Sequence, residues 1–155
     1  LVIFGPHISD NAAPTRKAIE QRFHVPAISV TGTEEWLGEW TFSLPQGSLT
    51  DEPVYWAHLI KKRGLQTVGA IVENSLVGES YIKNLRKACD ELGLSLISEE
   101  RIAQTAQDMG DAIGKLHATK PDALVHCGFG FGIVHANPAL RPLYVRGVDA
   151  RPSPA

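Results

Sequence analysis

The chain has 155 residues, 43% of them hydrophobic and 21% charged, which is an ordinary composition for a soluble globular protein. Fifteen basic residues against seventeen acidic ones give a formal net charge of −2, and neither sign forms a long run. These numbers argue against a nucleic-acid partner and against binding to an anionic membrane surface. No stretch reaches the roughly 18 apolar residues that a membrane-spanning helix needs. The two cysteines, Cys89 and Cys127, are too few for a disulfide scaffold.

Strand-like and helix-like segments alternate along the chain. Short apolar runs predict strands at residues 1–4, 27–30, 67–72, 94–97 and 123–126. Capping residues and apolar residues at helical spacing predict helices from 9–11 to about 23, from 50 to 64, from 79 to 92 and around 109–116. The intervening stretch around 38–47, rich in Gly, Trp and Pro, is expected to be irregular. This order predicts an α/β fold with parallel sheets and right-handed crossovers.

The loops that follow the strands are the expected location of function, because parallel sheets bind ligands outside the carboxyl ends of their strands. Four such loops are rich in glycine and hydroxyl residues: 5–9, 31–33, 73–78 and 127–132. Small residues let a ligand approach the backbone, and hydroxyl groups supply neutral donors and acceptors. The sequence therefore predicts a binding site for a small polar molecule.

The residues for enzyme chemistry are not arranged in the usual patterns. The glycines from Gly128 to Gly132 follow G-x-G-x-G, with Ile133 where a dinucleotide fingerprint needs its third glycine. The six histidines lack a paired metal-ligand spacing, and no G-x-S-x-G elbow surrounds a serine. The acidic pairs Glu34–Glu35 and Glu99–Glu100 resemble solvated charge. We therefore expect no metal, no cofactor and no catalysis.

Three further side chains have competing interpretations. Trp36 and Trp40, four residues apart, either form a hydrophobic plug beneath the loop or line the ligand site as an aromatic wall. Cys89 lies on the apolar stripe of the helix at 79–92, which favours a buried thiol over a disulfide or a reactive group.

The ordered motifs resemble the type I periplasmic binding proteins of branched-chain amino acid and amide ABC importers, also known as extracellular ligand-binding receptors. Residues 5–9 are similar to the family's G-P-x-x-S loop, and residues 25–33 to its strand and threonine loop. Residues 42–45 occupy its F-R-x-x-P crossover, residues 68–93 its strand, glycine and helix, and residues 121–128 its P-D strand. The resemblance covers residues 1 to about 132, which is only part of the family's usual length.

The resemblance implies two Rossmann-like lobes, both incomplete here. Residues 1–46 would belong to the first lobe and 47–135 to the second, while 136–155 form a tail outside the resemblance. In the first lobe, Ser9 would bind a ligand carboxylate, helped by the helix N-terminus that follows it, and the Thr31 backbone would bind an ammonium group. The other implied ligand-binding residues are Gly32, Thr33, Val77 and Phe129, where Val77 replaces the family's usual tyrosine and Phe129 lines the cleft.

The function that this resemblance implies is that of a solute-binding component of an ABC importer. It would capture a small polar ligand between two lobes in the periplasm or outside the cell, and a membrane permease would sense the closure. The alternatives are a ligand sensor on the same fold and a small α/β nucleotide-dependent enzyme. Because lobes that lack segments leave apolar surface exposed, we also expect the chain to form a homodimer or to aggregate.

Overall fold

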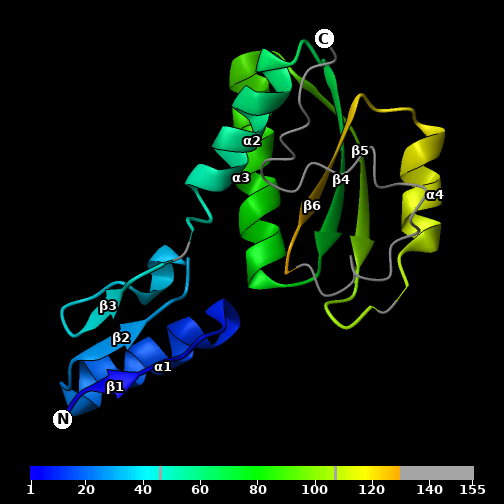
Figure 1. The fold of residues 1–155 in the computed structure, drawn as a ribbon. Helices are drawn as coiled ribbons and strands as arrows, with labels where there is room; N and C mark the ends of the chain where they lie inside the picture. Colours follow the sequence, from blue (N-terminus) through cyan, green and yellow to red (C-terminus); the bar gives the residue numbers. More distant parts are fainter. Residues whose placement is uncertain (46, 107, 130–155) are drawn as a thin grey trace, which may run out of the picture. The chain divides into compact units, whose positions relative to one another are not determined.

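A computed structural model describes residues 1–45, 47–106 and 108–129. The chain divides into two compact units, Leu1–Glu52 and the part from Pro53 onward. Each unit has a three-stranded parallel sheet of its own (Figure 1). The α/β class with parallel sheets is therefore confirmed, whereas the lobe boundaries at 46 and 135 stay predictions and the tail 136–155 lies outside the described residues.

The sheet of the first unit has the order β1-β2-β3, formed by β1 (Ile3–Phe4), β2 (Ala27–Ser29) and β3 (Thr41–Ser43). A continuous helical run connects β1 to β2. It consists of a 3₁₀ turn at Ser9–Asn11, α1 at Ala12–Ala18 and a π-helical turn at Ile19–Phe23. A left-handed residue, His24, ends the run, as is common where a helix stops.

Trp36 forms the centre of the core of the first unit. Its side chain is fully buried with Ala12, Ile19 and Ala27, and its indole N–H donates a hydrogen bond of 2.9 Å to the carbonyl of Phe42. The structure therefore supports the plug interpretation of Trp36, which lies in a short 3₁₀ helix at Glu34–Trp36.

Large apolar side chains remain exposed in the first unit. Phe4, Ile28 and Phe42 are in register across the three strands, and Phe4 is 76% exposed and Phe42 48%. Parallel sheets are normally covered on both faces. The exposed phenylalanines therefore agree with the expectation of uncovered apolar surface.

The second unit has helices on both faces of its sheet (Figure 1). The sheet has the order β5-β4-β6. Buried side chains from α2 and α3 pack on one face, together with both cysteines, which are free thiols, and those from α4 pack on the other. The element bounds are β4 Thr67–Glu73, β5 Ser95–Ile102, β6 Ala123–Cys127, α2 Asp51–Lys62, α3 Leu76–Leu92 and α4 Gly110–Ala118.

Three elements differ clearly from the sequence-based expectation, of which one is β5, which continues to Ile102 instead of ending at residue 97. Strand β3 lies within the stretch expected to be irregular, so the first unit has three strands instead of the two expected. Helix α3 begins at Leu76, earlier than the expected Glu79, because the Ser75 hydroxyl accepts the N–H of Gly78 at 3.0 Å and caps the helix. No helix among the described residues is long and apolar enough to cross a membrane.

Candidate functional site at the carboxyl ends of the strands

Hydroxyl groups connect the three strand ends of the first unit. Ser29, the last residue of β2, donates its hydroxyl to the carbonyl of Pro6 at 2.5 Å and accepts the N–H of Thr31 at 3.0 Å. Ser43, at the end of β3, donates to the carbonyl of Thr31 at 2.7 Å. The loops after β1, β2 and β3 are thus joined around Thr31. Neither serine was selected from the sequence, because the strand that ends at Ser43 was not predicted and Ser29 lay inside the predicted strand 27–30.

Thr31 has a polar group that the surrounding protein does not satisfy. The residue is 3% exposed, and within the described part of the chain its buried hydroxyl has no hydrogen-bond partner. Leaving a buried hydroxyl unpaired costs about 1–3 kcal/mol. Its backbone carbonyl accepts one hydrogen bond from Ser43 and retains a second lone pair. Both oxygens therefore retain unused hydrogen-bonding capacity.

The neighbouring predicted residues also have structural roles. Gly32 is glycine for a steric reason, since a Cβ there would lie 2.9 Å from the carbonyl of Gly47. The Thr33 hydroxyl accepts the N–H of Glu35 at 3.2 Å and caps the short helix at 34–36. Ser9 is 2% exposed at the start of the first helical run. The structure thus places Ser9, Thr31, Gly32 and Thr33 in one unit, on loops that follow β1 and β2.

A buried carboxylate lies at the carboxyl end of the second sheet. Glu73 ends β4 and is 2% exposed. One carboxylate oxygen accepts the N–H of Phe129 at 2.8 Å, and the other lies 3.5 Å from the imidazole Nε2 of His126. Sequence reasoning missed Glu73, although an acidic residue at the end of an otherwise apolar strand was a usable signal.

The two predicted site residues of the second unit are placed differently from each other. Val77 lies in the first turn of α3 and is 1% exposed, so its side chain belongs to the protein interior. Phe129 is partly exposed, just beyond β6, and its backbone is bound to Glu73. Glycine at position 78 allows close packing, since a Cβ there would lie 2.0 Å from the carbonyl oxygen of Glu73. The other glycines of the loop at 127–132, from Gly130 on, lie outside the described residues.

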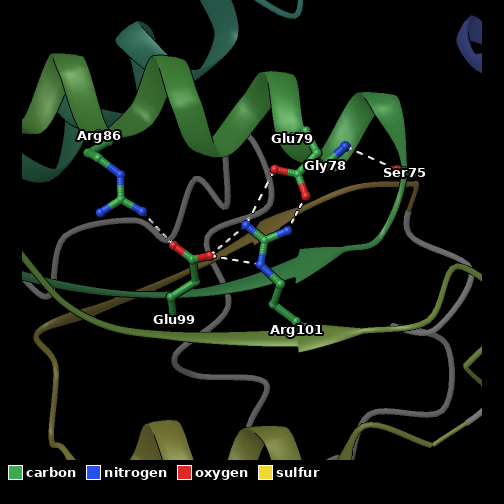
Figure 2. Close-up of polar contacts among 6 residues, drawn as sticks. All are labelled: Ser75, Gly78, Glu79, Arg86, Glu99 and Arg101. Carbon is green, nitrogen blue, oxygen red and sulfur yellow. Dashed lines mark hydrogen bonds and ion pairs between the residues drawn. The ribbon is translucent and has the colours of Figure 1, made fainter.

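A charged network connects α3 to β5 (Figure 2). Arg101 binds the carboxylate of Glu79 and also that of Glu99, with its Nη2 2.9 Å from Glu99 Oε1. Arg86 reaches the other oxygen of Glu99 at 2.7 Å, while Glu100 pairs with Lys115 on α4 at 3.2 Å. Glu99 and Glu100 therefore each form ion pairs with basic side chains, Glu99 with Arg86 and Arg101 and Glu100 with Lys115. In the described part of the chain, no three His, Cys, Asp or Glu side chains gather as metal ligands.

Parallel α/β units with glycine and hydroxyl loops at the carboxyl ends of the strands are typical of domains that bind small molecules. A sequence model of the periplasmic binding protein family matches residues 1–143. The chain belongs to this family, and the match extends past residue 132, where the motifs identified by sequence analysis end. No curated protein matched the chain.

Solved structures share the fold. An extracellular ligand-binding receptor from Rhodopseudomonas palustris HaA2 is similar at 25% identity and a TM-score of 0.75, over 95% of this chain and 41% of that one. A branched-chain amino acid ABC transporter protein from Thermus thermophilus with bound valine is similar at 18% identity and a TM-score of 0.71, over 92% of this chain and 37% of that one. A solute-binding protein of an R. palustris ABC transporter in complex with benzoate is similar at 16% identity and a TM-score of 0.76, over 86% of this chain and 38% of that one. The chain thus spans about two fifths of the length of these relatives.

Proposed function

We propose that the chain is the solute-binding part of an ABC importer and captures a small polar ligand, such as an amino acid or an amide, between two lobes. Membership of the periplasmic binding protein family supports a ligand-binding role. Similar folds occur in proteins described with bound valine and with bound benzoate. Both of these ligands carry a carboxylate, which is the group that the first-unit loops would bind.

The observation that carries the proposal is the buried hydroxyl of Thr31, which has no hydrogen-bond partner among the residues that the structure describes. Proteins seldom leave such a group unsatisfied, and each exception calls for a specific explanation, which we propose here is a bound ligand. Ser29 and Ser43 fix the backbone of Thr31 by bonding to its N–H and its carbonyl. A hydroxyl held in this way is preorganised for a ligand, which reduces the ordering cost of binding.

The proposed roles of the other residues follow from their positions. Ser9 binds the ligand carboxylate, and the second lone pair of the Thr31 carbonyl accepts a ligand ammonium or amide N–H. Thr33 contributes its hydroxyl as a donor, because that oxygen already accepts the N–H of Glu35. Gly32 keeps the loop close to residues 47–49, and Phe129 supplies an apolar wall from the second unit. Val77, the sixth proposed contact, would act only at the edge of the site because it is 1% exposed.

The proposal also covers the partner of the protein, its location and the expectation that it is not an enzyme. The protein acts in the periplasm or outside the cell, delivers its ligand to a membrane permease, uses no cofactor and catalyses no reaction. It does not bind nucleic acid, as the net charge of −2 suggests. The exposed Phe4 and Phe42 support self-association of the chain as a homodimer.

A thermal-shift screen of the full chain tests the proposal. The panel contains amino acids, amides, urea, short-chain acids, benzoate and nucleotides. A ligand that binds only the folded state raises the Tm by mass action, by an amount equivalent to about 2.7 kcal/mol at a concentration one hundred times Kd. We expect a shift with an amino acid, amide or carboxylic acid, and its loss in Ser9→Ala.

Two other outcomes would favour a different function. A shift with nucleotides alone would contradict the proposal and favour the nucleotide-dependent enzyme. A ligand sensor would give the same shift as an importer, so a second measurement is needed to separate them: the ligand-loaded chain should stimulate ATP hydrolysis by its permease complex. No stimulation by a chain that binds ligand would favour the sensor.

A further inference from the structure

Glu73 is a buried acidic residue that the proposed ligand contacts do not include. Among the described residues it is the one Asp, Glu, Lys or Arg that is buried. Removing a carboxylate from water costs several kcal/mol unless hydrogen bonds and a partner charge compensate. Its retention at the end of β4, next to a proposed binding loop, therefore points to a role that an apolar residue could not fill.

The carboxylate of Glu73 contacts both the end of β6 and the turn that follows it. Its Oε2 accepts the backbone N–H of Phe129 at 2.8 Å. Its Oε1 lies 3.5 Å from Nε2 of His126, whose side chain is 4% exposed. One side chain on β4 thus holds the end of β6 and the residues just beyond it.

The absence of a side chain at Gly128 lets the turn pack closely against Glu73. Its φ of +158° is a conformation that favours glycine. A Cβ at this position would lie 2.2 Å from Cδ of Glu73, so the turn lies directly against the carboxylate. The turn is therefore fixed by a hydrogen bond, by the contact with His126 and by close packing on the same carboxylate.

We infer that Glu73 is a positioning residue, which fixes the turn at Gly128–Phe129 and thereby determines which ligands the site accepts. Functional side chains must be held within about 0.5 Å of their working position by the groups behind them. The selectivity part of this inference rests on the proposed function, since it assumes that Phe129 lines the site. The positioning part does not depend on a ligand.

Hydrogen exchange at the Phe129 amide tests the positioning part on the full 155-residue chain. We expect Glu73→Ala to accelerate exchange at this amide about tenfold relative to core amides such as that of Leu85. Glu73→Gln, which retains an acceptor oxygen, should restore most of the protection. Ile71→Ala is the matched control, because Ile71 lies on the same strand and its side chain belongs to the core cluster packed against α4.

If Glu73→Ala does not fold, Gly128→Ala provides a second test of whether Glu73 fixes the turn at Gly128–Phe129. Its new Cβ would push the carboxylate away from the turn, so we expect faster exchange at Phe129 in this variant too. Exchange at Phe129 that responds no more to Glu73→Ala or to Gly128→Ala than to Ile71→Ala would overturn the inference.

Calorimetry with L-valine and benzoate tests the selectivity part. Moving an apolar wall should affect an aromatic probe and an aliphatic one unequally, so we expect Glu73→Ala to change the ratio of the two Kd values by about fivefold. Ile71→Ala should leave the ratio unchanged, and Glu73→Gln should restore it. A parallel loss of both affinities would refute the selectivity role. Failure of the wild-type chain to bind either probe would instead contradict the proposed function for these ligands, while exchange at Phe129 still decides the positioning part.

Discussion

The hydroxyl of Ser29 lies 2.5 Å from the carbonyl oxygen of Pro6, so the end of β2 is bonded to the loop that follows β1. The same hydroxyl accepts the N–H of Thr31. One buried side chain thus controls the relative placement of two loops that carry proposed ligand contacts, Ser9 on one and Thr31 on the other.

Replacing Ser29 should therefore affect both stability and binding. Ser29→Ala leaves the carbonyl of Pro6 and the N–H of Thr31 without their partner, and we expect a loss of about 1–3 kcal/mol in the free energy of unfolding. Urea denaturation followed by circular dichroism measures this. The control is Ser95→Ala, at an exposed serine that begins β5, where we expect less than about 0.5 kcal/mol. Equal effects of the two substitutions would contradict the structural role of Ser29.

Two glycines in the helices of the second unit should respond in opposite ways to alanine. At Gly78 in α3, a Cβ would lie 2.0 Å from the carbonyl oxygen of Glu73, so Gly78→Ala should destabilise the chain by about 2 kcal/mol or more. At Gly114 in α4 the space that a Cβ would fill is open, so Gly114→Ala should stabilise the chain by roughly 0.5–1 kcal/mol. Both changes in stability can be measured from the urea concentration at the unfolding midpoint, provided that the variants and the wild type have equal m-values. A neutral Gly78→Ala would show that α3 does not approach β4 as closely as described.

Cys127 should make the stability of the second unit depend on alkaline pH. Burial raises the pKa of its thiol to about 12, from an ordinary value of 9.0. Above pH 9 the unfolded chain releases this proton while the folded chain retains it, so stability is fully present below pH 9 and declines as the pH rises toward 12. The decline is at most about 1.4 kcal/mol for each pH unit. Unfolding measured across this range should show a shallower decline in Cys127→Ala, and identical slopes would contradict the burial of the thiol.

Asp122 should act at the acid end of the pH range. Hydrogen bonds from the N–H groups of Gln66 and Thr67 hold the pKa of this carboxyl below its ordinary value of 3.8. The resulting stability is present above that value and disappears as the pH falls through the lowered pKa. We expect Asp122→Asn to lower the Tm by roughly 3 °C at neutral pH and by much less at about pH 2. Thermal unfolding at the two pH values measures this, and a Tm difference that did not shrink in acid would contradict the assignment.

The second unit could be predicted from sequence more fully than the first. Its strands are apolar runs such as Val68–Val72, and the apolar face of α3 is evident in Ile82, Leu85 and Cys89. By contrast, β3 has three residues and no apolar run. Its position depends on Glu20, a residue distant in sequence, whose carboxylate accepts the N–H of Trp40 and the hydroxyl of Thr41. Local pattern contains no information on such a contact.

The candidate site was predictable in its loops but not in its supporting groups. Parallel strand order and loop composition selected the loops at 31–33 and 127–132, and the family resemblance then singled out Thr31 and Phe129 within them, a choice that stays a prediction. The residues behind them, Ser29 and Glu73, became evident only when the structure showed which backbone groups they bind. The acidic residue that follows the apolar run 68–72 was a usable signal for Glu73, whereas a serine at the end of a short strand has no sequence signature that separates it from a solvated residue.

The buried hydroxyl of Thr31 supports the most direct test of the account. Thr31→Val keeps the shape of the side chain and removes the unpaired oxygen. Because this removes an unsatisfied buried group, we expect the ligand-free chain to be as stable as the wild type or more stable, while Kd for the ligand found in the screen rises about tenfold. Thr31→Ser should retain binding, and Thr105→Val, at an exposed turn position, should change neither quantity.

The deciding measurement is isothermal titration of that ligand into the wild type and Thr31→Val, with the Tm of each ligand-free protein measured on the same samples. We expect weaker binding by Thr31→Val together with an unchanged or higher Tm of the ligand-free protein. Undiminished affinity in Thr31→Val would contradict the proposal that this hydroxyl is a ligand contact.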